Sequence, residues 1–304
     1  MFLRWKNYAL FAGLALVLCP GALTAGQKLD PNSHVGKVAH AMQLFQGGKY
    51  HEAEVEFRML LDEDEKTKGL DHADTLQDRK NLAIVLGVEG NYLESENTLR
   101  EGIELETSIL GADNKDVLEF RELLATTYSR EGRTTEAVHD FREILAIRQR
   151  IAKPGDITIS RAMSNLGSVL VDSAAYAEAE KLLRAAQPGL DKGLQPNDAA
   201  ILLNRTNLAK CLIGLGRYAE AEKEQRIIIS TLEQFLGIHP EVALARLNLA
   251  ATLRAENKLP EALETARLAE KQLSQMLGPD HEKAKEARQL TKELAEAASK
   301  TGAK

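Results

Sequence analysis

The chain repeats itself with a period of 42 residues. The segment GRYAEAEKE at 216–224 has counterparts elsewhere, among them GKYHEAE at 48–54 and GNYLESE at 90–96. With one single-residue slip, the aromatic position of this motif recurs as Tyr50, Tyr92, Thr134, Tyr176, Tyr218 and Leu259. Three residues later a small side chain recurs as Ala53, Ser95, Ala137, Ala179, Ala221 and Ala262. Such a period predicts a repeat architecture, in which stacked units bury one another's apolar faces.

A second landmark divides each unit in two. Clusters of Gly, Pro, Asp and Asn surround the equivalent positions Gly69, Gly111, Lys153, Gln195, Gly237 and Gly278. These clusters are typical of turns and helix starts, so each unit contains two helices. The residues predicted to be helix N-caps are Asp71, Asp113, Asn197 and Asp280.

Apolar residues follow helical spacing in both halves of the unit. In the first helix of the second unit they are Leu82, Ala83 and Leu86. The second helix is predicted to open at the tyrosine position and to bury the small residue, where two helices approach closely. One such hairpin cannot bury its apolar stripe alone, whereas a stack of hairpins can.

These positions resemble the tetratricopeptide repeat. The matching pairs include Leu166 with Gly167, Tyr218 with Ala221, Ala53 with Phe57, and Ala137 with Phe141, and Tyr128 matches as a single residue. The 42-residue period exceeds the standard 34, and the linker LGPDH at 277–281 resembles that of kinesin light chain-type repeats. The resemblance implies an all-α, right-handed superhelical solenoid of helix-turn-helix repeats. We expect six repeats over 34–279 and a C-terminal capping helix over 280–300.

Some positions depart from the repeat pattern. Thr134 replaces the tyrosine of the third unit, and Ala174 replaces the glycine of the fourth. Arginine stands where the family has a large apolar residue, at Arg79, Arg121, Arg205 and Arg246. We interpret these arginines as stems packed between helices, with their heads paired to neighbouring glutamates. A surface that recognises charge is the alternative.

An asparagine recurs immediately before the first-helix leucine, as Asn81, Asn165, Asn207 and Asn248. It lies about 100° round the helix from that leucine, beside the core face. The resemblance implies that first helices line the concave face and that this asparagine bonds the backbone of a bound peptide, since an amide both donates and accepts. The alternatives are a cap on a neighbouring carbonyl or a consensus residue without a role in binding.

Charged residues of both signs are predicted to accompany the asparagines in this groove. The cations are Lys80, Arg130, Arg161, Lys210 and Arg254, and the acids are Glu119, Glu122 and Asp172. Mixed signs indicate no single ligand charge. Lys80, Lys210 and Arg254 weakly suggest the branch of the family that grips a C-terminal carboxylate.

The sequence contains no recognisable set of catalytic or metal-binding residues. His72 and His281 fall in equivalent linkers and His239 one residue off that register, which indicates turn residues rather than metal ligands. Cys211 stands among first-helix leucines and is predicted to be a buried, inert thiol. The repeated glutamates are interpreted as solvated helix faces. We expect no catalytic residue, metal or cofactor.

The first 26 residues read as a secretory signal. Arg4 and Lys6 precede an apolar stretch at 8–18, Pro20 follows, and cleavage is expected after Ala25 or Gly26. The apolar stretch is shorter than the roughly 20 residues that span a bilayer. We therefore expect a periplasmic or secreted protein without a membrane span in its mature form. An uncleaved N-terminal segment that tethers the chain to the membrane is the alternative.

The net charge of −6, without a basic run, makes nucleic acid an unexpected partner. The expected function is a non-catalytic scaffold that binds a protein or peptide in its groove. The alternatives are a structural adaptor that self-associates in the cell envelope and an accessory subunit of a separate enzyme.

Overall fold

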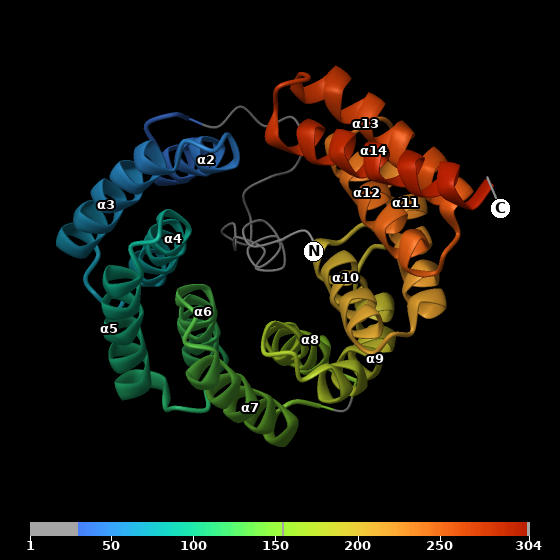
Figure 1. The fold of residues 1–304 in the computed structure, drawn as a ribbon. Helices are drawn as coiled ribbons and strands as arrows, with labels where there is room; N and C mark the ends of the chain where they lie inside the picture. Colours follow the sequence, from blue (N-terminus) through green and yellow to red (C-terminus); the bar gives the residue numbers. More distant parts are fainter. Residues whose placement is uncertain (1–29, 154, 303–304) are drawn as a thin grey trace. The chain divides into compact units, whose positions relative to one another are not determined.

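A computed structural model describes residues 30–153 and 155–302, which form thirteen α-helices and no strand. The predicted signal at 1–26 lies outside these residues and stays a prediction. The chain divides at Pro154 and Gly155 into two compact units. We call residues 30–153 the first stack and residues 155–302 the second stack, and Figure 1 colours them from blue to green and from yellow-green to red.

The first stack contains six helices, each packed on the next along the chain. They are α2 (His34–Gln46), α3 (Tyr50–Thr67), α4 (Ala73–Glu89), α5 (Tyr92–Leu110), α6 (Lys115–Glu131) and α7 (Thr134–Ile151). Helix α4 also contacts α6, so the two lie in one layer while α3, α5 and α7 form the other (Figure 1). The core between the layers includes Phe57, Leu82 and Leu86, all buried.

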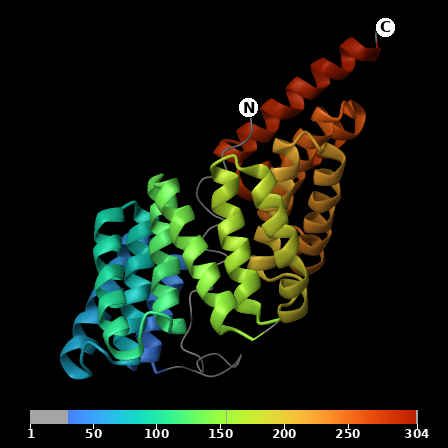
Figure 2. The ribbon, with the colours of Figure 1, turned by 90° about the horizontal axis from the view of Figure 1, so that it is seen from below.

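The second stack contains seven helices in the same sequential packing. They are α8 (Ile157–Asp172), α9 (Tyr176–Gly193), α10 (Ala199–Gly214), α11 (Tyr218–Leu236), α12 (Pro240–Ala255), α13 (Leu259–Leu277) and α14 (Glu282–Gly302). The last helix packs on α13 and α12 and lies at the end of its stack (Figure 2). It buries Ala284, Ala287 and Leu294 there, which makes it the predicted capping helix.

The tyrosine register marks the start of every second helix, as predicted. Helices α3, α5, α7, α9, α11 and α13 begin at the six residues of that register, from Tyr50 to Leu259. The small residue three positions later has no exposed surface in any of the six units. A small side chain at this place lets the two helices of a hairpin approach closely, so a larger one would overpack the core.

The predicted N-caps are wrong by one residue. The caps are His72, Asn114, Asp156, Asp198 and His239, each of which accepts a hydrogen bond from the backbone N–H two residues on. Asp71, Asp113 and Asn197 stand one place too early for that bond, and at the start of α14 His281 rather than Asp280 accepts from the Lys283 N–H. Turn clusters locate a helix start only to within a residue or two, because several of their members can cap.

The cap register also corrects the reading of His239. The single-residue slip of the repeat falls before it, so His239 stands in register with His72 and His281. All three accept a backbone N–H through Nδ1, at 3.2–3.3 Å. They are turn residues, as expected.

None of the described helices combines the length and the apolar character that crossing a membrane requires.

Candidate functional site

The recurrent asparagines all lie on first helices: Asn81 on α4, Asn165 on α8, Asn207 on α10 and Asn248 on α12. Their environments differ. Asn165 and Asn248 are half-buried, whereas Asn81 and Asn207 are each only 2% exposed. In α4, the Asn81 side-chain oxygen accepts from the Gln77 amide, one turn earlier, at 3.1 Å.

Helix α10 treats its asparagine differently. The Asn207 oxygen accepts from the Lys210 ammonium at 3.3 Å, while its Nδ2 group has no hydrogen-bond partner among the described residues. Leaving a buried N–H unsatisfied costs about 1–3 kcal/mol. The asparagine of α10 therefore carries a donor that a ligand could satisfy.

Lys210 is a half-buried cation whose ammonium donates a hydrogen bond to Asn207. Burial lowers the pKa of its ammonium, and the carboxylate of Asp172 on α8 opposes that shift. One turn before Asn207, the Asn204 amide nitrogen donates to the Leu183 carbonyl at 2.9 Å and to Gln187 at 2.8 Å, while its own oxygen lacks a partner. Helix α10 thus holds a run of polar groups that its neighbours only partly satisfy.

The predicted groove lysine of the first stack is already engaged. The Lys80 ammonium on α4 donates to Glu119 on α6 at 2.8 Å and lies 5.0 Å from the centre of the Phe120 ring. Lys80 is only 7% exposed. Nearby Glu106 is buried, and that burial raises its pKa, while Lys80 opposes the shift. This lysine compensates acids of its own stack.

The remaining predicted groove cations are dispersed. Arg130, near the end of α6, is half-buried, and burial lowers its pKa to about 10. Arg161 on α8 is half-buried, and Arg254 on α12 is exposed and pairs with Glu293 of α14 at 2.7 Å. Within the second stack, Lys210 donates to Asn207 whereas Arg254 pairs with Glu293. The structure therefore does not bring them together as a clamp for one carboxylate.

The arginines at the apolar position of the first helices pair as predicted. Arg79 donates to Glu65 and Glu101, and Arg121 to Glu143. Arg205 donates to Glu224 and Asp191, and Arg246 to Gln272 and Glu233. Each arginine joins its first helix to one or both flanking second helices, which confirms the interpretation as packed stems with paired heads.

Arginine also recurs at a second position of the repeat, which was not among the predicted features. Five residues after the small residue of each unit stand Arg58, Arg100, Arg142, Arg184, Arg226 and Arg267. Three of them reach the motif glutamate of the next unit: Arg58 pairs with Glu94 at 2.7 Å, Arg184 with Glu220 at 3.0 Å, and Arg226 with Glu261. Glu94 and Glu261 are exposed and Glu220 is half-buried, but all three bridge units, which corrects the interpretation of these glutamates as merely solvated helix faces. The same alignment that showed the tyrosines contained this signal.

Cys211 on α10 is buried, as predicted, and burial raises the pKa of its thiol to about 12. A thiol with such a pKa is a poor nucleophile and a poor metal ligand at neutral pH.

Comparison with known proteins places these features in a family. The sequence profile of the tetratricopeptide repeat matches residues 116–192 and 198–275, together just over half of the chain. No curated protein matches the chain.

Several solved structures have the same fold at low identity. One contains the nearly identical TPR-like repeats of a Podosopora anserina protein described as a kinesin light chain, with 19% identity, a TM-score of 0.59, and coverage of 66% of this chain and 96% of that one. BtubC (BKLC) from P. vanneervenii is 17% identical with a TM-score of 0.61, over 81% of this chain and 93% of that one.

A third solved structure contains a bound peptide. It is the Rap conjugation gene regulator of plasmid pLS20 in complex with the Phr* peptide, 14% identical with a TM-score of 0.60, over 90% of this chain and 79% of that one. At these identities the likeness concerns the fold. The profile match over just over half of the chain shows that the chain belongs to the tetratricopeptide repeat family.

Proposed function

We propose that the chain is a non-catalytic scaffold that binds an extended peptide segment of a partner protein along its first helices. Membership of a repeat family of protein-binding scaffolds supports this reading. So does the peptide bound to the Rap regulator, a protein of the same fold. The net charge of −6 argues against nucleic acid as the partner.

The observation that carries the proposal is the state of helix α10. Asn207 has an orphaned amide donor, and the Lys210 ammonium beside it has only a 3.3 Å bond to that same asparagine among the described residues. A peptide carbonyl would accept from Asn207, and a carboxylate would pair with Lys210. Both gains are larger in a half-buried site than in water, because the local dielectric is lower.

Other groove positions would extend the contact on either side of α10. Asn165 and Arg161 on α8 and Asn248 on α12 are half-buried, so their polar atoms remain within reach of a ligand. In the first stack, Asn81, Lys80 and Arg130 stay predicted groove residues. Lys80 would have to leave Glu119 to contact a peptide.

Export to the cell envelope forms part of the proposal and rests on the N-terminal sequence alone. The charged start, the short apolar stretch and the small residues up to Gly26 support a cleaved signal. Fractionation of cells, with intact-mass measurement of the purified chain, tests it. A mass that corresponds to a start at Gly26 or Gln27 in the exported fraction would agree, and an uncut chain in the membrane fraction would favour the tethered alternative.

The decisive experiment for binding is capture from envelope extract with three forms of the chain. The wild type should retain a partner that the variant combining Asn207→Ala with Lys210→Ile loses. The matched control is Lys223→Met, which removes an exposed lysine of α11 in the second-helix layer and should retain the partner. Helical circular dichroism should be the same for all three. Equal capture by the double variant would refute the groove on α10.

A second candidate is self-association. The last two residues of α11, Phe235 and Leu236, and Ile238 in the following turn expose large apolar side chains, and Ile238 is 78% exposed. Such a group is typical of a contact surface. Sedimentation velocity over a range of concentrations would show a dimer if it forms, and Ile238→Asp should then abolish it. An enzyme among the captured proteins would instead support the accessory-subunit alternative.

A further inference from the structure

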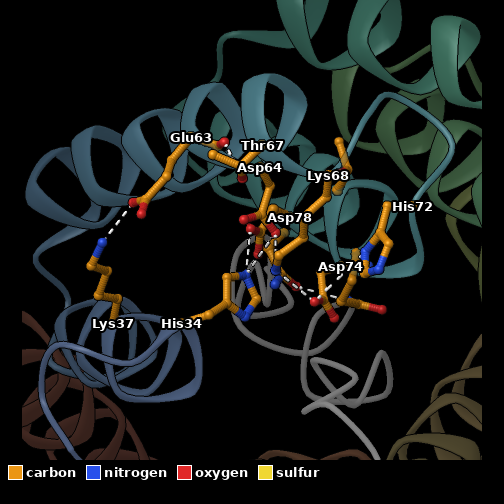
Figure 3. Close-up of polar contacts among 12 residues, drawn as sticks. His34, Lys37, Glu63, Asp64, Thr67, Lys68, His72, Asp74 and Asp78 are labelled. Atoms are coloured by element: carbon orange, nitrogen blue, oxygen red, sulfur yellow. Dashed lines mark hydrogen bonds and ion pairs between the residues drawn. The ribbon is translucent and has the colours of Figure 1, made fainter.

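A polar cluster at the N-terminal end of the first stack is unrelated to the repeat pattern. His34 opens α2, Asp64 lies near the end of α3, and Asp74 and Asp78 stand in the first two turns of α4. Lys68 lies at the end of α3, and Figure 3 shows its side chain and that of His34 directed at the carboxylates. Three helices thus deliver one imidazole and three carboxylates to one place.

The contacts within the cluster are short. His34 Nε2 lies 2.9 Å from Asp78 Oδ2 and 3.1 Å from Asp64 Oδ2. The Lys68 ammonium bridges Asp64 at 2.9 Å and Asp74 at 2.6 Å. One donor atom each from His34, Asp64 and Asp74 can be chosen so that all three lie within 4.8 Å of one another.

The cluster holds more negative charge than it compensates. With a neutral imidazole, three carboxylates face a single ammonium, which leaves a surplus of two negative charges. Asp64 is 3% exposed and Asp78 fully buried, and Asp78 Oδ1 has no hydrogen-bond partner among the described residues. Buried carboxylates of this kind require a cation or a proton.

We propose that this cluster binds one divalent transition-metal cation of the zinc class. His34 Nε2 and one oxygen each from Asp64 and Asp78 would be its ligands, while Lys68 keeps Asp74. The two ligand carboxylates then balance the cation, and the ammonium balances the third acid. An imidazole with carboxylates suits Zn²⁺ better than Mg²⁺ or Ca²⁺, which prefer oxygen alone.

The two separations between His34 and its carboxylate neighbours are compatible with such a centre. Tetrahedral ligands at about 2.0–2.1 Å from Zn²⁺ lie about 3.3 Å from one another. The two contacts of His34 are therefore within a few tenths of an ångström of that spacing. The cation would fasten the start of α2 to α3 and α4, at the open end of the stack.

Titration of the full chain, without an affinity tag and stripped with a chelator, tests the site. Calorimetry with Zn²⁺ should show one equivalent bound, and Co²⁺ should give the visible absorption of a tetrahedral centre. His34→Gln and the isosteric Asp78→Asn should each weaken zinc binding about tenfold or more. The matched control is His139→Gln, in the exposed group formed with Asp140 and Glu143, which should bind like the wild type.

Two results would overturn the site: a wild type that binds no zinc, or a His34→Gln chain that binds it as tightly. In the first case the cluster is compensated without a metal ion. If circular dichroism shows that Asp78→Asn is unfolded, His34→Gln decides, because His34 is partly exposed at a helix start. Partner capture depends on α10 in the other stack, so the two proposals fail independently.

Discussion

Helices α4 and α10 occupy the same place in their repeats, but the hydrogen bonds and neighbours of their asparagines differ. Asn81 and Asn207 are 126 residues apart, which is three periods, and both are buried. Three residues further on, α4 has the buried Ile84 where α10 has Lys210. Gln77 satisfies the Asn81 oxygen, whereas α10 leaves an amide donor without a partner. A shared backbone position can therefore serve packing in one repeat and ligand contact in another.

The ionisable groups with shifted pKa also differ between the stacks: carboxylic acids with a raised pKa occur in the first stack, while a cation whose pKa burial lowers occurs in both, as Arg130 and Lys210. The first stack contains Asp78, Glu89 and Glu106, acids whose pKa is raised, with burial as the largest cause. The second stack contains Lys210, whose pKa is lowered by burial. In the first stack Lys80 opposes the pKa shift of Glu106, and in the second stack the carboxylate of Asp172 opposes that of Lys210.

The largest effect is expected from Ile84→Lys, which gives α4 the residue of α10. Ile84 is 5% exposed, so the substitution loses apolar burial and desolvates an ammonium. We expect a loss of about 3–5 kcal/mol in the free energy of unfolding. Urea denaturation followed by circular dichroism measures it. A loss below about 1 kcal/mol would mean that the two positions are more alike than their burial suggests.

Lys80→Met should have the next largest effect. It removes the partner of Glu119 and the cation that faces the buried Glu106, so we expect a loss of about 1–3 kcal/mol. The same denaturation measures it, with Lys37→Met as a control, since Lys37 pairs with Glu63 at an exposed site. The control should change stability by less than about 1 kcal/mol.

Glu89→Gln tests one of these raised pKa values through the pH dependence of stability. Burial and a hydrogen bond with Glu54 raise the pKa of Glu89 to about 7, from 4.5 in the unfolded chain. Between these values the folded state holds a proton that the unfolded state has released, so stability falls as pH rises from about 4.5 to 7. The effect is on the order of 1 kcal/mol after solvent screening. Urea midpoints at pH 5 and pH 7.5 should differ less in the glutamine variant than in the wild type.

Lys210→Ile should have the smallest effect on stability, and of the opposite sign. It gives α10 the residue of α4 and removes a half-buried cation whose pKa burial lowers, against the effect of Asp172. Unfolding should become unchanged or harder by up to about 1 kcal/mol, because replacing a buried charge with an apolar side chain is often neutral or favourable. A loss of stability would show that Lys210 has a structural partner and would weaken its assignment to a ligand.

The fold could be predicted because the same weak helix-start motif recurs at an almost constant spacing. One tyrosine before an alanine means little, but six registers locate every second helix to the residue. The N-caps were missed by one place because each linker offers neighbouring residues able to cap, such as Asp113 and Asn114. The arginines from Arg58 to Arg267 recur with the same period, so the sequence contained the signal that would have predicted the bridges between units.

For the candidate site, the sequence predicts the recurring asparagine position but not the hydrogen bonds of each asparagine. Whether an asparagine is satisfied depends on residues that vary between repeats, Gln77 one turn before Asn81 and Lys210 one turn after Asn207. The cluster of His34, Asp64 and Asp78 could not be predicted at all. Its members lie 30 and 14 residues apart, on helices that a periodic reading treats as interchangeable.

The arginines that bridge one unit to the next, Arg58, Arg184 and Arg226, affect how easily such a chain can gain or lose a repeat during evolution. The acceptor lies 36 residues further along in two cases and 35 in the third, the one that spans the slip. If duplication or excision of a gene segment adds or removes one whole period, the new junction still brings an arginine to a glutamate. Copy number can thus drift without any compensating substitution at the junction, while the side chains of individual first helices diverge.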